Sequence, residues 1–428
     1  MDQGRIAMNC KRVIFILLVL APGISMAKVN VLDYGAKADG KTDDTAAIQR
    51  TLDAAAKDRG GVVEMPKGLY RVEDHLVIPP GVCLSGEWQA PHHANTEHGT
   101  VILAVGHVGK EDGPALINLG QSSAIKGITI FYPDQDPAAV KPYPWAIQGK
   151  GMHGSVIDVT LVNPYKGIDF GTHPNELHYI RNVFGCPLKL GIYVNRTTDI
   201  GRIENVHFNP HSWGRCSFND KAKGEGWTKL CAYLEQNLEG FKIGQTDWEY
   251  MSGCFVILAK TGLHFVHTQN GDPNVVLTQC GSDISPLGVQ VDASQSHAGL
   301  AFTNCQFMST VKIRPENRGP VKFNNCGFWP VEKTGSQAIL CGTGTTSFVG
   351  CHFSGWGRNG TNSPCIDVQG GAALIQACDF FNEKKPQLRV DAKAAGVAIS
   401  GCRLQGGERF EIADEAKKNV QAGLNLTR

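Results

Sequence analysis

The feature that most constrains the fold is a short segment that recurs at a nearly constant interval through the second half of the chain. A typical copy is Phe302-Thr-Asn-Cys-Gln-Phe307, in which an Asn precedes a small apolar residue. Successive copies lie 21 to 27 residues apart and share one cysteine position, occupied by Cys254, Cys280, Cys305, Cys326, Cys351, Cys378 and Cys402. A period of this length that holds over several copies indicates a stacked repeat architecture.

Each repeat is predicted to consist of short strands, because apolar and polar residues alternate and Gly, Asn and Pro separate the runs. An Asn or Gly before the cysteine position suits a tight corner between two strands, since these residues best tolerate a left-handed backbone. A third strand begins at a Gly-apolar-x-apolar signal, which recurs at Gly167, Gly191, Gly240, Gly262 and Gly288. Three strands per repeat predict an all-β chain, a right-handed parallel β-helix.

The end of the predicted solenoid is expected to carry a cap. An amphipathic helix is predicted from Asp44 or Thr45 to about Ala56, with Ile48 and Leu52 on its apolar face. Such a helix would cover the open apolar end of the first coil. The expected divisions are a signal peptide (1–27) and one β-helix domain (28–428), made of an N-terminal cap (28–70), coils (71–404) with an insertion near 210–239, and a C-terminal tail (405–428).

The cap also carries a resemblance to a known group of proteins. The segment Asp33-Tyr-Gly-Ala-Lys-Ala-Asp-Gly-Lys-Thr-Asp-Asp-Thr-Ala-Ala-Ile-Gln49, followed by Gly60-Gly-Val-Val-Glu-Met-Pro66, resembles the N-terminal signature of the pectate lyase-like superfamily, which includes polygalacturonase-related proteins. The resemblance implies the same right-handed β-helix and action on a polysaccharide. It is specific for the fold and says little about the reaction.

The N-terminal segment predicts an exported protein. Basic residues, the apolar run from Val13 to Ala21 and the small-x-small end Ser25-Met-Ala27 predict a cleavable signal peptide, and hence a secreted or periplasmic location. The apolar run is too short to span a bilayer. A net charge of +1 provides no strong positive potential that would attract nucleic acid or a membrane surface, so neither is expected as a partner.

The cysteines in the repeat are predicted to be buried small hydrophobes and not disulfide partners, because they share one inward position. Cys216 and Cys231 are the candidate pair for a disulfide bridge.

An acidic residue recurs seven positions before the repeat position in three successive coils. These residues are Glu176, Asp199 and Asp247, counted back from Val183, Val206 and Cys254. Since coils stack about 4.8 Å apart, neighbouring carboxylates would lie at spacings that suit glycosidases. We therefore predict Asp247 and Asp199 as the catalytic acid/base or nucleophile pair, assisted by Glu176. The competing interpretation is a solvated ladder of charges.

A second column is predicted on the outward position of the Gly-apolar-x-apolar strand, where Asp169, Tyr193, Lys242 and His264 recur. Together with nearby side chains it supplies cations, aromatic faces and hydrogen-bonding groups for a sugar. The predicted substrate-binding residues are Asp169, Tyr193, His207, Trp248, Lys242 and Glu249.

The predicted function is a secreted glycoside hydrolase that cleaves a polysaccharide, with paired carboxylates and no metal or other cofactor. The chain lacks the Asn-Thr-Asp-Gly and Arg-Ile-Lys motifs of polygalacturonases, so their catalytic residues cannot be transferred. One alternative is a polysaccharide lyase, which would need a basic residue such as Lys242 or Arg202 and could use calcium. The other alternative is a non-catalytic glycan-binding or adhesive β-helix.

Overall fold

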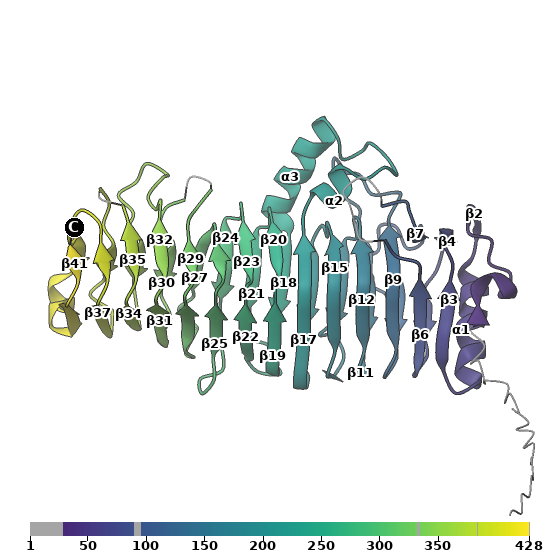
Figure 1. Ribbon diagram of the computed structural model, residues 1–428, viewed down its shortest axis with the longest axis horizontal. Helices are drawn as coiled ribbons and strands as arrows, with labels where there is room; N and C mark the ends of the chain where they lie inside the picture. The colour runs from purple at the N-terminus through teal and green to yellow at the C-terminus, as the bar shows by residue number, and fades with distance from the viewer. Residues whose placement is uncertain (1–28, 90–95, 332–333, 383, 428) are drawn as a thin grey trace, which may run out of the picture.

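The computed structural model describes residues 29–89, 96–331, 334–382 and 384–427. This part of the chain forms one elongated solenoid whose N-terminal and C-terminal coils lie at opposite ends (Figure 1). Its strands form two sheets, of 28 and 13 strands, and run parallel to their neighbours in the adjacent coils. The predicted all-β, right-handed parallel β-helix is confirmed. The predicted signal peptide lies outside the described residues.

Each regular coil contributes one strand to the 13-stranded sheet and two strands to the 28-stranded sheet. Two successive coils consist of β21 (Thr261–Phe265), β22 (Pro273–Thr278) and β23 (Gly281–Asp283), then β24 (Leu287–Val291), β25 (Leu300–Thr303) and β26 (Gln306–Phe307). Each strand pairs with its counterpart in the next coil. Side chains that are about two dozen residues apart in sequence therefore lie about 4.8 Å apart along the axis.

The corners of the coils are built as the repeat predicts. Asn182, Asn205, Asn304 and Asn325 all have φ between 51° and 53°, in the left-handed region. Their side chains also hydrogen-bond from coil to coil: Asn205 Nδ2 donates to Asn182 Oδ1 over 2.8 Å, and Asn325 Nδ2 donates to Asn304 Oδ1 over 2.7 Å. Asparagine thus both adopts the left-handed backbone of the corner and hydrogen-bonds to the asparagine at the same corner of the next coil.

The seven repeated cysteines line the interior, where each is at most 2% exposed. All thirteen described cysteines are free thiols, Cys216 and Cys231 included, so the structure does not form the candidate bridge. Cys186 and Cys254 are examples of thiols enclosed by the apolar core.

The burial of these thiols predicts their reactivity. In the native protein a thiol reagent should label mainly the partly exposed Cys83, Cys231 and Cys341, and the repeated cysteines should react only after unfolding. Counting modified cysteines by mass spectrometry, with and without denaturant, checks this. Rapid labelling of Cys305 or Cys326 in the native protein would contradict the burial of the column.

The first coil is closed by helix α1 (Thr45–Lys57), which buries Ile48 and Leu52 as predicted. Asp44 holds the N-cap position without a side-chain capping bond. Its buried carboxylate instead accepts hydrogen bonds from the backbone N–H groups of Lys37 and Ala38. Asp44 therefore closes the loop before the helix, which explains an acidic residue at this place without a catalytic role.

The insertion near 210–239 contains two helices, α2 (His211–Gly214) and α3 (Glu225–Asn237), which project from the middle of the solenoid (Figure 1). Helix α3 leads directly into β18 (Glu239–Ile243) of the 13-stranded sheet. Leu230 and Leu234 are buried on the inner face of α3. Among the described residues there is no helix with the length and apolar character needed to cross a membrane.

Candidate functional site

The main polar groove lies on the outward face of the 13-stranded sheet. Strands β16 (Leu190–Val194), β18, β21 and β24 place Tyr193, Lys242, His264 and Gln290 in one ladder, each paired with the next in register. The ladder borders a hollow of about 480 Å³, which Asp292 and Arg314 also line. A second hollow of about 410 Å³ continues from it and shares His267 and Glu316. The groove therefore extends over several coils.

His264 occupies the centre of this groove and contacts two carboxylates. Its Nε2 lies 2.8 Å from Asp292 Oδ2 and its Nδ1 lies 3.4 Å from Glu239 Oε2. The second contact lacks hydrogen-bond geometry, so it is an ion pair only. Gln290 Nε2 donates to Asp292 Oδ1 over 2.8 Å and fixes that carboxylate. The His264 side chain is 11% exposed, so these partners and not solvent surround the imidazole.

The electrostatics of the groove favour a protonated His264. Burial alone would lower the pKa of His264, but the hydrogen bond with Asp292 and the ion pair with Glu239 outweigh it, and the pKa is raised. Burial alone would raise the pKa of Asp292 and of Glu239. Their contacts with His264 help to outweigh this effect, so the pKa of both carboxyl groups is lowered. An imidazolium between two carboxylates is the stable arrangement near neutral pH.

This arrangement predicts a pH-dependent contribution to stability. Because the pKa of His264 is higher in the folded than in the unfolded protein, its stabilising effect is complete below about pH 6.5 and is lost as pH rises through the raised pKa. The difference in unfolding free energy between the wild type and His264→Gln should therefore shrink from pH 6 to pH 9. Urea unfolding at both pH values measures it, and a difference that grows with pH would contradict the assignment.

Two cations accompany the imidazole. Lys242 Nζ lies 3.3 Å from Glu239 Oε2, and Arg314 lies close enough to Asp292 to lower the pKa of that carboxyl. Tyr193 is half-buried on the other side of Lys242 and stacks on Trp145, with ring centroids 6.4 Å apart. The groove thus offers positive charge, a proton donor and an aromatic wall within a few coils.

A larger hollow, of about 720 Å³, lies on the same sheet face toward the N-terminal coils. Asn118 lines it and stands on the same ladder, three coils before Tyr193. Between them, Gln148 Nε2 donates to Asp169 Oδ2 over 2.6 Å. At about 4.8 Å per coil, Asn118 and Tyr193 are separated by roughly 14 Å, and the larger hollow reaches His173, in the coil next to that of Tyr193. A long polymer could therefore contact both hollows.

Two of the predicted substrate-binding residues, Tyr193 and Lys242, lie together in the groove. Asp169 stands on the same ladder but is 0% exposed, and its carboxylate accepts hydrogen bonds from Gln148 and from the backbone of Gly171 and Thr172. The side chain of Asp169 therefore holds a turn below the surface of this structure, and its substrate-binding role stays a prediction.

Glu249 is also buried. Its sugar-binding role stays a prediction, but its side chain points into the core with 0% exposure. There its Oε1 lies 3.1 Å from Nε2 of the equally buried His178. Gly201 leaves the space for this pair, since a Cβ at that position would lie 2.2 Å from Glu249 Oε2. Glu249 is a structural residue of the coil interior.

The predicted acidic residues lie on the other sheet, away from the groove, in β14 (Asn175–Glu176), β17 (Thr197–Phe208) and β19 (Thr246–Ser252). Asp199 and Asp247 are exposed, and Thr198 Oγ1 donates to Glu176 Oε1 over 2.7 Å. A β-bulge between Thr197 and Ile200 shifts Asp199 out of register, so the three do not form the straight column that was expected. Their catalytic role stays a prediction.

Asp247 and Trp248 share a smaller hollow of about 370 Å³ with His297 and Lys322. Trp248 is 46% exposed there, which suits an aromatic face for a sugar ring. His207 is half-buried on β17 and packs edge-on against Phe255. The substrate-binding roles of Trp248 and His207 stay predictions.

Glu239, Asp292 and Arg314 line or border the groove but were not among the residues predicted from the sequence. The Gly-apolar-x-apolar signal at Gly288 could have found Asp292, which lies two positions after Gln290. Arg314 lies two positions after Lys312, the partner of Gln290 in the next strand, which has no signal glycine. Glu239 could not be placed in this way, since it precedes the signal glycine and its direction depends on how α3 enters β18.

Comparisons with known proteins agree with this architecture. The family model for rhamnogalacturonase A/epimerase, pectate lyase-like, matches residues 28–118. The structure of the mannuronan C-5 epimerase AlgE6 A-module from Azotobacter vinelandii aligns over 94% of this chain and 99% of its own, with a TM-score of 0.51 and 13% identity. The fold is the pectate lyase-like right-handed parallel β-helix.

Curated relatives match this chain over shorter segments. Alginate lyase 7 of Azotobacter vinelandii is 65% identical over 43 residues, which are 10% of this chain and 5% of the relative. Mannuronan C5-epimerase AlgE3 of the same organism is 58% identical over 163 residues, which are 35% of this chain and 8% of the relative. The chain therefore spans a small part of the length of these relatives.

Proposed function

We propose that this β-helix is an enzyme that binds an acidic polysaccharide along the groove and acts on the proton at C5 of a uronic acid unit, as a lyase or an epimerase. The observation that carries the proposal is the position of His264, held between Asp292 and Glu239 beside Lys242 and Arg314. The alginate lyase and the mannuronan epimerases among its relatives support this class of reaction.

Elimination and epimerisation of a uronate share their first step. A base removes the proton at C5, and a cation near the carboxylate stabilises the negative charge that develops. The lyase then protonates the glycosidic oxygen as the C4–O bond breaks, whereas the epimerase returns a proton to C5 from the opposite face. The required side chains are a cation, a base and an acid within reach of one sugar unit.

The groove can supply all three roles. Arg314 would bind the carboxylate, and His264, kept protonated by its two carboxylates, would donate the proton. Lys242 and Tyr193 are the candidates for the base. Burial and the charge of Asp169 raise the pKa of Tyr193, which favours its neutral phenol form, so we assign proton removal to Lys242 after substrate releases it from Glu239.

A hydrolase is less well supported at this groove. A glycosidase needs one carboxylic acid whose pKa is raised so that it can protonate the leaving group. The carboxylates nearest the centre of the groove, Glu239 and Asp292, have lowered pKa values and are tied to His264. Hydrolysis through Asp199 and Asp247, and a non-catalytic role in glycan binding, are therefore tested as alternatives.

The test is a panel of purified polymannuronate, polyguluronate, polygalacturonate and neutral polysaccharides. The proposal expects turnover of at least one uronate polymer, seen as ultraviolet absorbance from an unsaturated product or as a changed epimer ratio by NMR. New reducing ends without either signal would indicate hydrolysis, and binding without turnover would indicate a binding module. Since Arg314 supplies the positive charge, we expect added calcium to leave the rate unchanged.

A further inference from the structure

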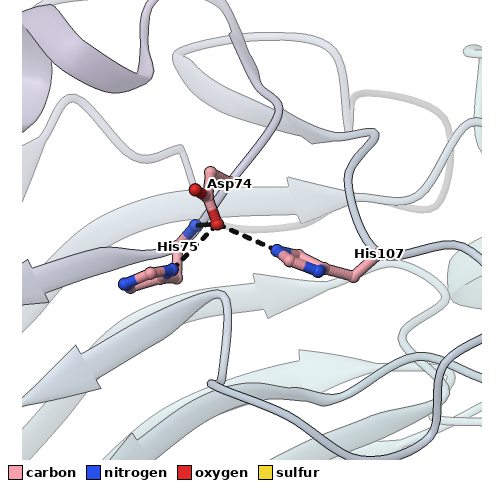
Figure 2. Close-up of side chains that lie close together, drawn as sticks. All are labelled: Asp74, His75 and His107. Atoms are coloured by element: carbon pink, nitrogen blue, oxygen red, sulfur yellow. Dashed lines mark hydrogen bonds and ion pairs between the residues drawn. The ribbon is translucent and has the colours of Figure 1, made fainter.

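A second polar cluster lies near the N-terminal end of the solenoid, outside the groove. Asp74 and His75 precede β5 (Leu76–Ile78), and His107 follows β7 (Thr100–Ala104) in the next coil. His75 Nδ1 lies 2.8 Å and His107 Nε2 lies 2.9 Å from the same oxygen, Oδ1 of Asp74. Figure 2 shows both rings directed at this carboxylate. Two successive coils thus bring two imidazoles and one carboxylate together.

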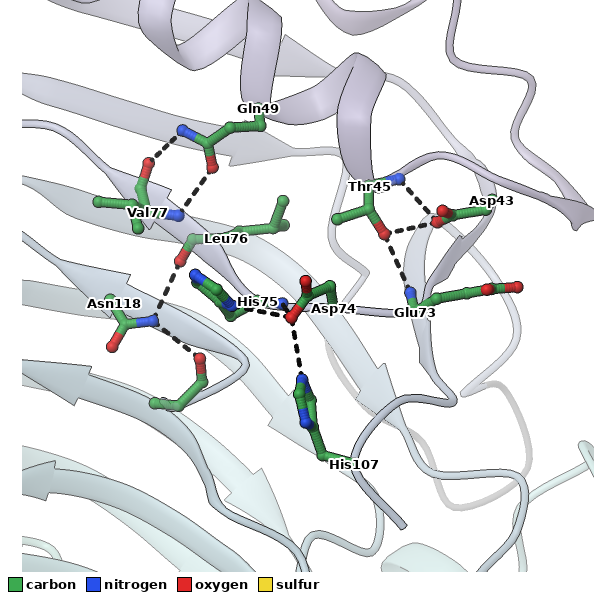
Figure 3. A network of polar contacts seen from close by, with 11 residues as sticks. Asp43, Thr45, Gln49, Glu73, Asp74, His75, Leu76, Val77, His107 and Asn118 are labelled. Atoms are coloured by element: carbon green, nitrogen blue, oxygen red, sulfur yellow. Dashed lines mark hydrogen bonds and ion pairs between the residues drawn. The ribbon is translucent and has the colours of Figure 1, made fainter. Parts of the chain in front are cut away.

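Helix α1 fixes the segment that carries Asp74 and His75. On one side, the Glu73 N–H donates to Thr45 Oγ1 over 2.9 Å. On the other side, the Val77 N–H donates to Gln49 Oε1 and Gln49 Nε2 donates to Val77 O, over 2.8 and 3.0 Å. Figure 3 shows these bonds on either side of the cluster. The backbone on both sides of Asp74 and His75 is therefore held before any ligand binds.

The loop that carries His107 is forced close to this segment. A Cβ at Gly106 would lie 2.0 Å from the carbonyl oxygen of Glu73, so only glycine permits the approach. His107 itself has φ of 60°, in the left-handed region that costs energy for a residue with a side chain. The chain accepts this conformation at the position that turns the imidazole toward Asp74.

The three side chains have the chemistry and the spacing of a metal site. Their candidate ligand atoms, one from each residue, all lie within 4.8 Å of one another. Atoms bound to one first-row divalent metal at about 2.0–2.1 Å lie roughly 3.0–3.4 Å apart, close to the observed separations from Asp74 Oδ1. Two histidines and a carboxylate form a known ligand set for such metals, with positions left open for other ligands.

An independent observation points to a polar ligand at the same place. Asp74 and His107 line a narrow cavity together with Tyr132 and Tyr143. Both tyrosines are at most 2% exposed, and within the described part of the chain neither hydroxyl has a hydrogen-bond partner. Buried hydroxyl groups normally have a partner, so two in one cavity suggest that a polar species belongs there. Water bound to a metal ion would provide the missing partner.

We propose that Asp74, His75 and His107 bind a divalent first-row transition metal ion, with zinc as the ion to test. The site joins the segment before β5 to the loop after β7, so the bound metal cross-links the first coils at the capped end. His75 also lines the 720 Å³ hollow on the sheet face, which places the metal at its rim. The inference departs from the prediction that the protein holds no metal, and it does not depend on the proposed enzymatic reaction.

The experiment is a calorimetric titration of zinc chloride into the untagged, chelator-treated protein, compared with His75→Gln and His107→Gln. Each variant removes one ligand and leaves Asp74 in place. We expect one zinc ion per chain in the wild type and an affinity at least about 100-fold lower in both variants, because even second-shell changes cost about 10–100-fold. His352→Gln, which removes an exposed histidine on β32 (His352–Ser354), is the matched control and should bind as the wild type does.

Two further measurements test whether the variants are folded and which atoms bind the metal. Circular dichroism establishes that each variant is folded, and zinc should raise the melting temperature of the wild type and the control but not that of the two variants. Cobalt should bind without a thiolate charge-transfer band, since the ligands are nitrogen and oxygen. Equal zinc affinity in all four proteins, a thiolate band, or no wild-type binding at millimolar zinc would overturn the proposal.

Discussion

His264→Gln should lower the turnover rate on a uronate polysaccharide by about 100-fold or more. A positioned proton donor contributes about 10²–10⁴-fold to such a reaction, and glutamine cannot supply the proton. Glutamine can still donate a hydrogen bond to Asp292, so the groove should keep its shape. Steady-state kinetics should therefore show a large fall in kcat with a much smaller change in KM.

The control for this prediction is His352→Gln, an exposed histidine several coils away, which should keep wild-type activity. Asp247→Asn and Asp199→Asn should also retain activity if the reaction occurs in the groove. If His264→Gln keeps full activity and the two aspartate variants lose it, the catalytic site lies on the 28-stranded sheet. That result would support Asp199 and Asp247 as the catalytic pair.

Glu249→Leu should destabilise the protein by about 1–3 kcal/mol, because it removes one member of a fully buried hydrogen-bonded pair and leaves Nε2 of His178 without its partner. His178 is held on its other side, where its Nδ1 lies 2.9 Å from Asn175 Oδ1, so it cannot turn to solvent. Denaturant unfolding monitored by circular dichroism gives the change in unfolding free energy.

Glu235→Leu is the comparison for the buried-pair prediction. Glu235 lies exposed on α3, and its replacement should change the unfolding free energy by no more than about 0.5 kcal/mol. A double variant in which both His178 and Glu249 become leucine should be more stable than Glu249→Leu alone, since the imidazole is then no longer buried without its hydrogen-bond partner. If Glu249→Leu is as stable as the wild type, the pair is not part of the folded core.

The fold could be predicted from the sequence because the repeat encodes it at several levels. Asn205 and Asn304 mark corners, Cys305 marks an inward position, and Gly262 marks the start of a strand, each at the same place in its coil. In a solenoid each coil packs on the coils before and after it in the sequence, so these local features also determine the contacts between coils.

The site was only partly predictable, for a geometric reason. Tyr193, Lys242 and His264 follow one strand signal from coil to coil, and the sequence placed them together. The register of Asp199 depends on a β-bulge in β17, and the direction of Glu249 depends on a second irregularity in β19, between Thr246 and Glu249; the sequence pattern reveals neither. The Asp74, His75 and His107 cluster was missed because a loop conformation, and not the repeat, brings His107 to its partners.

The most direct test of the central claim is to incubate the protein with polymannuronate and other uronate polymers in heavy water and to follow the C5 position by NMR. The account predicts loss of the C5 proton signal, through exchange with deuterium in an epimerase or through a C4–C5 double bond in a lyase. This loss should be abolished by Lys242→Met. Cleavage of a polymer with the C5 proton retained would contradict the account and indicate hydrolysis.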